Sequence, residues 1–150
     1  MRVAIGSDHA GFAMKGDLCT LLDELRVEYH DFGTYSTDAV DYPDFVAPVA
    51  HAVARGDYDL GIVLGGSGTG EAIVANKVRG IRCVQATDPV VARLAREHND
   101  ANVIAMGARI IGSEVAKGCL RAFLAGEYAG GRHVVRLEKL ARIEAEEAGR

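Results

Sequence analysis

The sequence predicts an α/β fold: a doubly wound, Rossmann-like sheet of five parallel strands with helices on both faces and an extra C-terminal helix. Short apolar runs rich in Val and Ile recur along the chain, and the longer segments between them carry apolar residues at helical spacing. Alternation of this kind produces parallel sheets joined by right-handed crossovers. The 150 residues suit a single domain, 1–150, because a chain of this length builds one core.

The five expected strands are the apolar runs at 3–6, 27–32, 61–64, 81–85 and 103–106, of which the second is the weakest. The expected helices are the periodic segments at 12–25, 45–53, 72–75, 90–95 and 115–124. Helix starts are marked by Pro43, by Asp88-Pro89 and by Gly112-Ser113. The chain therefore alternates strand and helix throughout, with no linker that would separate two domains.

A last helix is expected from His133 to Ala148, after the sheet is complete. Val134, Leu137, Leu140 and Ile143 form one apolar stripe along it. The core of a single chain has no need of this stripe, and such a surface is often buried by a partner. We therefore expect a homodimer or a larger assembly, with Gly130-Gly131 as the one candidate hinge.

Composition excludes several classes of function. The formal net charge of -4 argues against general nucleic-acid binding, which needs a concentrated cationic face. No apolar run approaches the roughly 20 residues that span a bilayer, and the N-terminus enters a strand pattern at once. Three cysteines with neither C-x-x-C nor zinc-ligand spacing favour reduced, buried thiols. We expect a cytoplasmic protein with no membrane partner.

The most informative stretch runs from Leu60 to Lys77, where a buried-strand pattern leads through a glycine-rich turn straight into a helix. The N–H groups of such a turn and of the following helix attract negative charge. Glu71 places a carboxylate beside them. This combination indicates proton transfer on an anionic sugar or acid, with the loop stabilising an oxyanion.

Three common glycine motifs are incomplete in this turn. A phosphate-binding P-loop needs Lys and Ser/Thr after Gly70, where the chain has Glu71 and Ala72. The dinucleotide fingerprint needs a glycine at position 71. A nucleophile elbow around Ser67 needs a glycine in place of Thr69. Nicotinamide binding is therefore disfavoured, and Ser67 is favoured as a hydrogen-bond donor over a nucleophile.

Polar residues follow the predicted strands. Asp8 and His9 come after the first strand, Glu71 closes the turn after the third, and Arg109 follows the fifth. Ligands of open parallel sheets bind at the carboxyl ends of the strands, so we expect Asp8, His9 and Glu71 to converge on one crevice. Plainer explanations stay open, because Asp8 can cap a helix and Glu71 can be a first-turn carboxylate stabilised by the helix dipole.

Further charged residues lie near the ends of later helices. His98 can simply sit at a helix C-terminus, where a cation is favourable. Arg132 and Arg136 are spaced i, i+4, so a helix presents both guanidinium groups on one face. Such a pair suits a phosphate monoester, which guanidinium binds through bidentate hydrogen bonds. Solvation alone would explain these arginines and Arg109 equally well.

The chain resembles the ribose-5-phosphate isomerase type B family, which also includes bacterial galactose-6-phosphate isomerase subunits. The resemblance runs in order from the first strand to the last helix, and this order makes it more specific than any single motif. It is carried by the motifs Gly6-Ser7-Asp8-His9-Ala10-Gly11-Phe12, Asp41-Tyr42-Pro43, Gly65-Gly66-Ser67-Gly68-Thr69-Gly70, Ala75-Asn76-Lys77, Arg96-Glu97-His98-Asn99-Asp100 and Gly131-Arg132-His133.

This resemblance implies an aldose–ketose isomerase that interconverts ribose 5-phosphate and ribulose 5-phosphate through a cis-enediolate, with no metal and no cofactor. It implies that His98, helped by Asp8, opens the furanose ring and that Glu71 carries the proton between C2 and C1. By the same resemblance, Ser67 and the N–H groups of Gly66, Gly68 and Gly70 hold the enediolate oxygens, Asn99 binds a sugar hydroxyl, and His9, Arg109, Arg132 and Arg136 hold the phosphate.

The resemblance also implies a homodimer or tetramer with the active site between two subunits. Many members of the family carry a cysteine base where this chain has Gly65, and the chain instead resembles the branch in which a glutamate takes that role. Two alternatives stay open. One is an isomerase of allose 6-phosphate, galactose 6-phosphate or a tetrose phosphate, and the other is a sugar-phosphate-binding protein without turnover.

Overall fold

A computed structural model describes residues 1–149 of the chain. Five parallel strands form one sheet in the order β2-β1-β3-β5-β4. Their bounds are β1 Arg2–Ser7, β2 Glu28–Asp31, β3 Leu60–Gly65, β4 Cys83–Gln85 and β5 Val103–Gly107. Both flanking strands of the central β3 are in parallel register with it, Val3 opposite Leu60 and Gly61 opposite Val103. The predicted five-stranded parallel sheet is confirmed.

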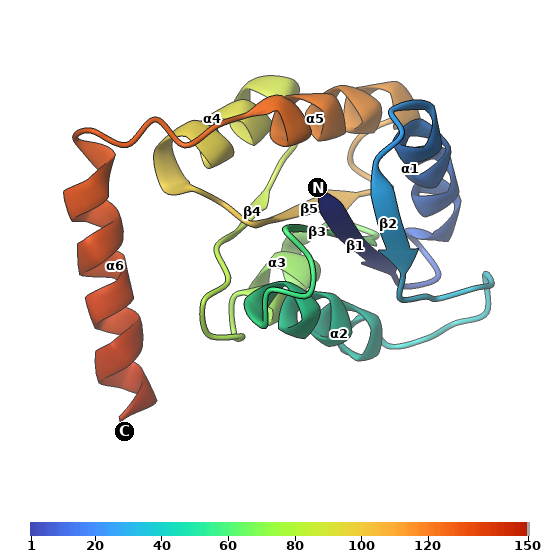
Figure 1. Ribbon diagram of the computed structural model, residues 1–150. Helices are drawn as coiled ribbons and strands as arrows, with labels where there is room; N and C mark the ends of the chain where they lie inside the picture. The colour runs from blue at the N-terminus through green and yellow to red at the C-terminus, as the bar shows by residue number, and fades with distance from the viewer. Residues whose placement is uncertain (150) are drawn as a thin grey trace.

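Helices cover both faces of the sheet (Figure 1). One face carries α1, α4 and α5, and the other carries α2 and α3. The helix bounds are α1 Phe12–Glu24, α2 Tyr42–Ala54, α3 Thr69–Ala75, α4 Pro89–Asn99, α5 Ser113–Ala125 and α6 His133–Ala148. The apolar side chains of β1, β3 and β5 point alternately into the two cores, which is why these strands read as continuous apolar runs.

The edge strand β4 is shorter than the apolar run at 81–85 predicts. Arg82 lies outside it, because the Arg82 N–H donates to the side-chain oxygen of Asn102 rather than to a neighbouring strand. On its open edge, the side chain of Asn76 accepts from the Cys83 N–H at 2.7 Å and donates to the Cys83 carbonyl at 2.9 Å. The Asn76 amide therefore caps the open edge of the strand beside Cys83, where a further chain would otherwise pair.

Helix α6 has the predicted bounds and projects away from the rest of the molecule (Figure 1). It follows Gly130 and Gly131, both in the left-handed region with φ of 62° and 56°, a conformation that glycine adopts without steric cost. Of its apolar residues, Val134, Val135, Leu140 and Ile143 are exposed. This chain alone therefore leaves the stripe of α6 largely uncovered.

Candidate active site

The candidate site lies where the sheet changes direction, between β1 and β3. The chain leaves β1 toward β2 on one side, while β3 pairs with the other edge of β1, and ligands of such sheets bind at this switch point. Asp8 and the glycine-rich turn follow these two strands, and the Asp8 N–H donates to the Leu64 carbonyl at 3.2 Å. One carboxylate oxygen of Asp8 accepts from the Gly11 N–H at 3.0 Å. Asp8 therefore does not cap α1, whose N-cap is Gly11 with no side-chain cap; its hydrogen bond to Gly11 lies in the turn before the helix and holds the carboxylate at the crevice.

The turn between β3 and α3 is rigid and close to the sheet. Gly68 precedes α3 with a φ of 81°, which glycine tolerates and other residues rarely do. The hydroxyls of Ser67 and Thr69 are hydrogen bonded at 2.6 Å, and the Thr69 N–H donates to the Ser67 hydroxyl oxygen at 3.3 Å. The Ser67 carbonyl accepts from the Gln85 side chain at 2.6 Å. These contacts connect the turn internally and tie it to the side chain of Gln85, the last residue of β4.

Glu71 is buried in this turn, with 3% of its surface exposed. Within residues 1–149, Oε2 of this carboxyl has no hydrogen-bond partner. Burial raises the pKa of Glu71 above its usual value, and the nearby Asp8 charge raises it further, while the N–H groups of Glu71 and Gly68 act in the opposite direction. A buried carboxyl with a raised pKa and a free oxygen is suited to accept and return a proton.

Arg109 and His9 complete this side of the site. A Cβ placed on Gly66 would lie 3.3 Å from a terminal nitrogen of Arg109, so the guanidinium lies over the glycine turn. Nδ1 of His9 accepts a hydrogen bond from the Val40 N–H at 3.2 Å. The neutral imidazole therefore carries its proton on Nε2 and presents a donor. We call the residues at this edge the carboxyl-edge group: Asp8, His9, Gly66, Ser67, Gly68, Gly70, Glu71 and Arg109.

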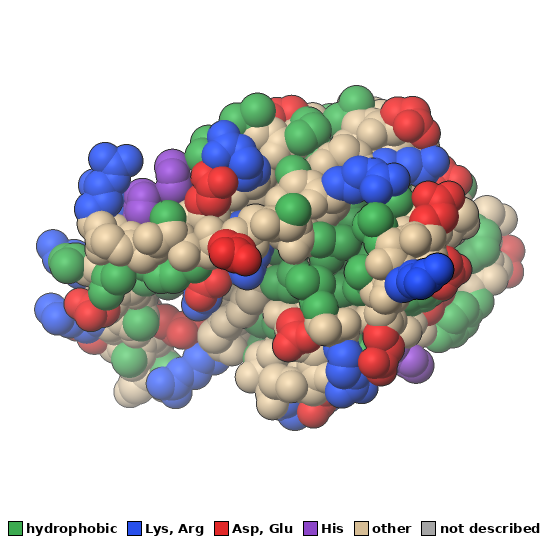
Figure 2. Space-filling model, turned by 45° about the horizontal axis from the view of Figure 1, so that its top comes forward, with side chains coloured by type: hydrophobic (Ala, Val, Ile, Leu, Met, Phe, Trp, Pro, Cys, Tyr) green, Lys and Arg blue, Asp and Glu red, His purple; other side chains and the backbone are tan. Residues whose placement is uncertain are grey.

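The other expected site residues lie elsewhere in the same chain. His98 and Asn99 are the last residues of α4, which runs back from the carboxyl end of β4 toward its start. The Asn99 carbonyl accepts a hydrogen bond at 2.9 Å from Nε of Arg82, the residue just before β4. Arg132 and Arg136 stand at the start of α6, next to His133, whose ring stacks on His98. We call His98, Asn99, Arg132 and Arg136 the helix-end group; Figure 2 shows histidine beside arginine side chains near α6.

The two groups lie at opposite ends of the sheet. Glu71 follows the last residue of β3, whereas Asn99 lies beside the first residues of β4, and all the strands are parallel. A six-residue strand such as β3 is about 20 Å long. This exceeds the reach of one sugar phosphate, so a single chain does not bring the two groups together.

Sequence reasoning assigned no role to Tyr42, which the structure places over the glycine turn. A Cβ on Gly70 would lie 2.8 Å from Cζ of the Tyr42 ring, so this ring forms a wall next to Glu71. The sequence did contain a signal for this residue, because Tyr42 belongs to the Asp41-Tyr42-Pro43 motif that carries the family resemblance. His133 was likewise noted only as part of a motif, although it packs against His98.

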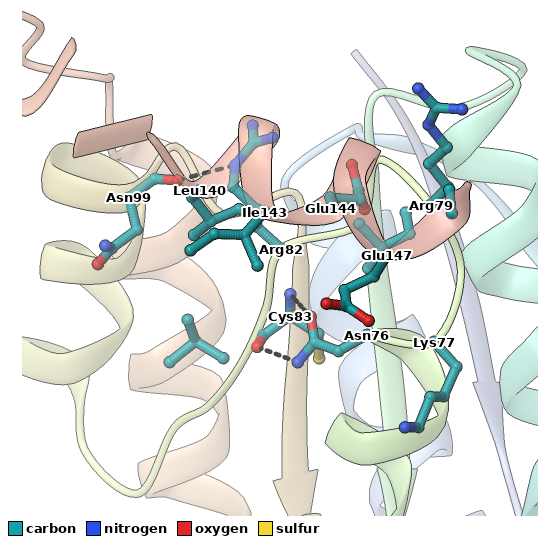
Figure 3. Close-up of a pocket in the computed structure, with 13 residues that line it drawn as sticks. Asn76, Lys77, Arg79, Arg82, Cys83, Asn99, Leu140, Ile143, Glu144 and Glu147 are labelled. Carbon is teal, nitrogen blue, oxygen red and sulfur yellow. Dashed lines mark hydrogen bonds between the residues drawn. The ribbon is translucent and has the colours of Figure 1, made fainter. Parts of the chain in front are cut away.

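A cavity of about 780 Å³ opens between α6 and the edge of the sheet. Leu140, Ile143 and Glu144 face it from α6, and Asn99 and Cys83 face it from the body (Figure 3). Figure 2 shows the molecule hollowed beside the projecting helix. The cavity adjoins the helix-end group through Asn99 and is separate from Glu71.

The described residues offer no group of three or more histidine, cysteine, aspartate or glutamate side chains that could hold a metal ion. No helix within 1–149 is long and apolar enough to cross a membrane.

A parallel α/β fold with a buried carboxyl beside a glycine turn, and with His9 and Arg109 at the same edge, is typical of enzymes that move protons on small anionic molecules. Comparison with known families refines this class. Residues 3–140 match the model of the Ribose/Galactose Isomerase family. The chain belongs to this family, whose members are sugar-phosphate aldose–ketose isomerases.

Named relatives cover almost the whole chain. It is 46% identical over 143 residues to ribose-5-phosphate isomerase B of Escherichia coli, covering 95% of this chain and 96% of the relative. It is 39% identical to D-erythrulose-4-phosphate isomerase of Pectobacterium atrosepticum, covering 98% and 97%. It is 38% identical to the galactose-6-phosphate isomerase subunit LacA of Enterococcus faecalis, covering 95% and 99%.

Solved structures agree with the fold. Ribose-5-phosphate isomerase B of Clostridium thermocellum superimposes with a TM-score of 0.96 at 44% identity, covering 98% of this chain and 99% of the other. Ribose-5-phosphate isomerase B of Mycoplasma genitalium, solved with bound ribulose 5-phosphate, gives a TM-score of 0.93 at 35% identity, covering 97% of both chains. The expected resemblance and the fold class are both confirmed.

Proposed function

We propose that this protein interconverts ribose 5-phosphate and ribulose 5-phosphate through a cis-enediolate, with Glu71 as the base. The observation that carries this proposal is the Glu71 carboxyl, buried beside the glycine turn with one oxygen unpaired among the described residues. Burial raises the pKa of Glu71, which makes its carboxylate a stronger base than that of an exposed glutamate. A buried carboxyl oxygen without a hydrogen-bond partner is costly to a fold, which favours a catalytic reason for Oε2 of Glu71.

In this scheme Glu71 removes the proton from C2 of the open-chain aldose and returns it to C1, while the proton of the C2 hydroxyl passes to the oxygen of C1. Negative charge develops on the oxygens of C1 and C2, and the N–H groups of Gly66, Gly68 and Gly70 with the Ser67 hydroxyl stabilise it. Preformed donors of this kind lower the barrier because they need no reorganisation during the reaction. Stabilising the enediolate also makes the substrate proton more acidic, so a carboxylate is a strong enough base.

Phosphate binding is assigned to His9 and Arg109 of the carboxyl-edge group and to Arg132 and Arg136 of the helix-end group. His9 presents an Nε2 donor because Val40 occupies Nδ1. Arginine forks bind phosphate oxygens in pairs. Opening of the furanose ring is assigned to His98 and Asp8, and binding of a sugar hydroxyl to Asn99.

We infer that two copies of the chain build each site, because the carboxyl-edge and helix-end groups lie at opposite ends of one sheet. The exposed stripe of α6, which includes Leu140 and Ile143, and the cavity beneath it supply an apolar surface for a second copy. A homodimer placed in this way brings His98 of one protomer to Glu71 of its partner. A tetramer would be a pair of such dimers.

The proposal includes a cytoplasmic location, which three free cysteines favour.

Sugars of other lengths are the second candidate, because relatives are named for tetrose and hexose phosphates. The distance from Glu71 to the phosphate-binding arginines sets the accepted chain length. Ratios of kcat/KM for tetrose, pentose and hexose phosphates measure this preference directly. A binding protein without turnover is the third candidate, and the complete set of Glu71, His98 and Asp8 disfavours it.

The deciding experiment measures conversion of ribose 5-phosphate by purified protein in EDTA. We expect turnover in the wild type and a loss of about 100-fold or more in Glu71→Gln, the usual range for a general base. Glu114→Gln is the matched control, since Glu114 also lies in the first turn of a helix but is exposed. Turnover of a hexose or tetrose phosphate alone would change the substrate assignment and keep the mechanism. Binding without turnover of any sugar would favour the hypothesis of a sugar-phosphate-binding protein.

A further inference from the structure

His133 contacts the side chain to which ring opening is assigned. The imidazoles of His98 and His133 stack with their centroids 4.3 Å apart and their planes 16° from parallel. His133 is the inner ring, with 8% of its surface exposed, while His98 is partly open to solvent. The stack is therefore a direct contact of the His98 ring with a second flat ring, and it restricts the plane in which the His98 ring lies.

The stack also joins two parts of the helix-end group. His98 belongs to the end of α4, and His133 is the first residue of α6, between Arg132 and Arg136. Arg132 is the residue immediately before the helix, without a side-chain cap, and Arg136 lies one turn further on. The position of His133 against His98 therefore fixes the ring relative to both phosphate-binding arginines.

We propose that His133 is a positioning residue for ring opening: its imidazole holds the His98 ring at the angle and distance from Arg132 and Arg136 that the cyclic sugar phosphate requires. This role depends on the proposed function. His133 acts through His98 and needs only a flat ring, not a proton. A lowered pKa, caused by burial and then by the charges of His98, Arg132 and Arg136, is consistent with a neutral ring that does not repel His98.

The two directions of the reaction separate this role from phosphate binding. Ribose 5-phosphate is mostly a furanose and must be opened before its C2 proton can leave. Ribulose 5-phosphate has no ring, because its C5 hydroxyl carries the phosphate. Both carry the same phosphate, so a residue that serves only ring opening affects one direction, and a phosphate ligand affects both.

The test compares His133→Ala and His133→Phe in both directions, with thermal unfolding as a check on folding. We expect His133→Ala to lower kcat with ribose 5-phosphate about tenfold or more, since small misplacements of a reacting group cost this much. Turnover of ribulose 5-phosphate should change less than about twofold. His133→Phe keeps a stacking ring and should recover most of the loss. Equal losses in both directions, no loss, or no recovery by phenylalanine would overturn the role.

A measurement that needs no activity accompanies these assays. The Hε1 proton of His98 should be shifted by the ring current of His133 in the NMR spectrum of the wild type, and the shift should disappear in His133→Ala and return in His133→Phe. An unchanged His98 signal in the alanine variant would refute the stack. Wild-type protein inactive with both sugars would instead overturn the proposed function, while the NMR shift would still report the stack.

Discussion

The carboxyl of Glu71 fills the space that a side chain at position 65 would occupy. A Cβ built on Gly65 would overlap Oε1 of Glu71 and lie 2.9 Å from Oε2. A cysteine at this position, as many members of the resembled family have, and a glutamate at 71 in this conformation therefore exclude each other. Under the proposed mechanism, the two residues are alternatives for placing a base at one point in space, so the chain can lack the cysteine and keep a base.

We expect Gly65→Ala to reduce kcat by about 100-fold or more, because the added methyl group must displace the carboxylate that acts as base. Steady-state kinetics with ribose 5-phosphate measures the loss. Gly16→Ala is the matched control, since nothing lies within 4 Å of a Cβ at that position and alanine favours a helix. Full activity in Gly65→Ala would show that the carboxyl of Glu71 does not need this space.

The raised pKa of Glu71 predicts a pH-dependent stability. The folded state holds this proton more tightly than the unfolded chain, in which the pKa of glutamate is about 4.3. The stabilising effect is present below that value and is lost as pH rises through the raised folded pKa. Glu71→Gln removes the effect. The melting temperature of this variant, relative to that of the wild type, should therefore rise as the pH increases from about 4 to about 7. Melting curves across this range test it, and a constant difference would contradict it.

The thiols should be unreactive at neutral pH. Burial, and then the charge of Glu71, raise the pKa of Cys83 to about 12, while burial and then Asp88 raise the pKa of Cys119 to about 11. Burial also raises the pKa of Cys19. Since the thiolate is the nucleophile, iodoacetamide should leave turnover intact, as measured by residual activity and by the mass of the protein.

A variant that carries a catalytic thiol gives the positive control for alkylation. Gly65→Cys combined with Glu71→Ala frees the space of the carboxyl and places a cysteine there. This double variant should regain part of the activity that Glu71→Ala loses, and iodoacetamide should then abolish it. Inactivation of the wild type traced to one of its three native cysteines would contradict the assignment of Glu71 as the base.

Lys15 is expected to anchor the loop that orients His9. Its ammonium, 2% exposed, donates to Asp31 at 2.7 Å and to the Thr34 carbonyl. Lys15→Met removes the cation from Asp31, which keeps only its hydrogen bond from the Gly33 N–H, and takes the ammonium donor from the Thr34 carbonyl. Loss of one partner of a buried pair costs about 3 kcal/mol or more. The melting temperature should fall by roughly 6–12 °C. KM should also rise, because the same loop carries Val40, which holds His9.

Lys117→Met is the control for this change, because the pair of Lys117 with Glu114 is exposed and such pairs contribute little. The melting temperature of that variant should stay within error of the wild type. A Lys15→Met protein as stable as the wild type would show that the buried pair does not anchor the loop.

The pattern of apolar residues was sufficient to predict most of the fold. β1, β3 and β5 are buried on both faces, so their continuous apolar runs are visible in sequence, and the stripe of α6 gave its bounds correctly. The start of β4 could not be predicted, because Ile81 is buried without belonging to the sheet and the side chain of Asn76 supplies contacts on its open edge.

The candidate site could be predicted only in part. Asp8 and Glu71 follow strands, and parallel strands end at one edge, so their proximity follows from topology. His98 ends a helix, and motif spacing alone does not say that this end lies at the opposite edge of the sheet from Glu71. The burial of Lys15 was also hidden, because its partners at 31 and 34 are brought to it by tertiary structure.

The separation of the carboxyl-edge and helix-end groups predicts that two inactive variants can restore each other. In a mixed dimer of Glu71→Gln and His98→Asn, one site receives both changes, and the other receives an intact Glu71 from one protomer and an intact His98 from its partner. Random pairing makes half of the dimers mixed, so refolding the two proteins together should recover about a quarter of wild-type activity on ribose 5-phosphate. Asp8→Asn mixed with Glu71→Gln is the control and should recover nothing, because Asp8 and Glu71 lie at the same edge of one chain. No recovery in the first mixture while a mixed dimer forms would place all the catalytic residues within one protomer, whereas recovery in the control would show that Asp8 and Glu71 of one site come from different protomers.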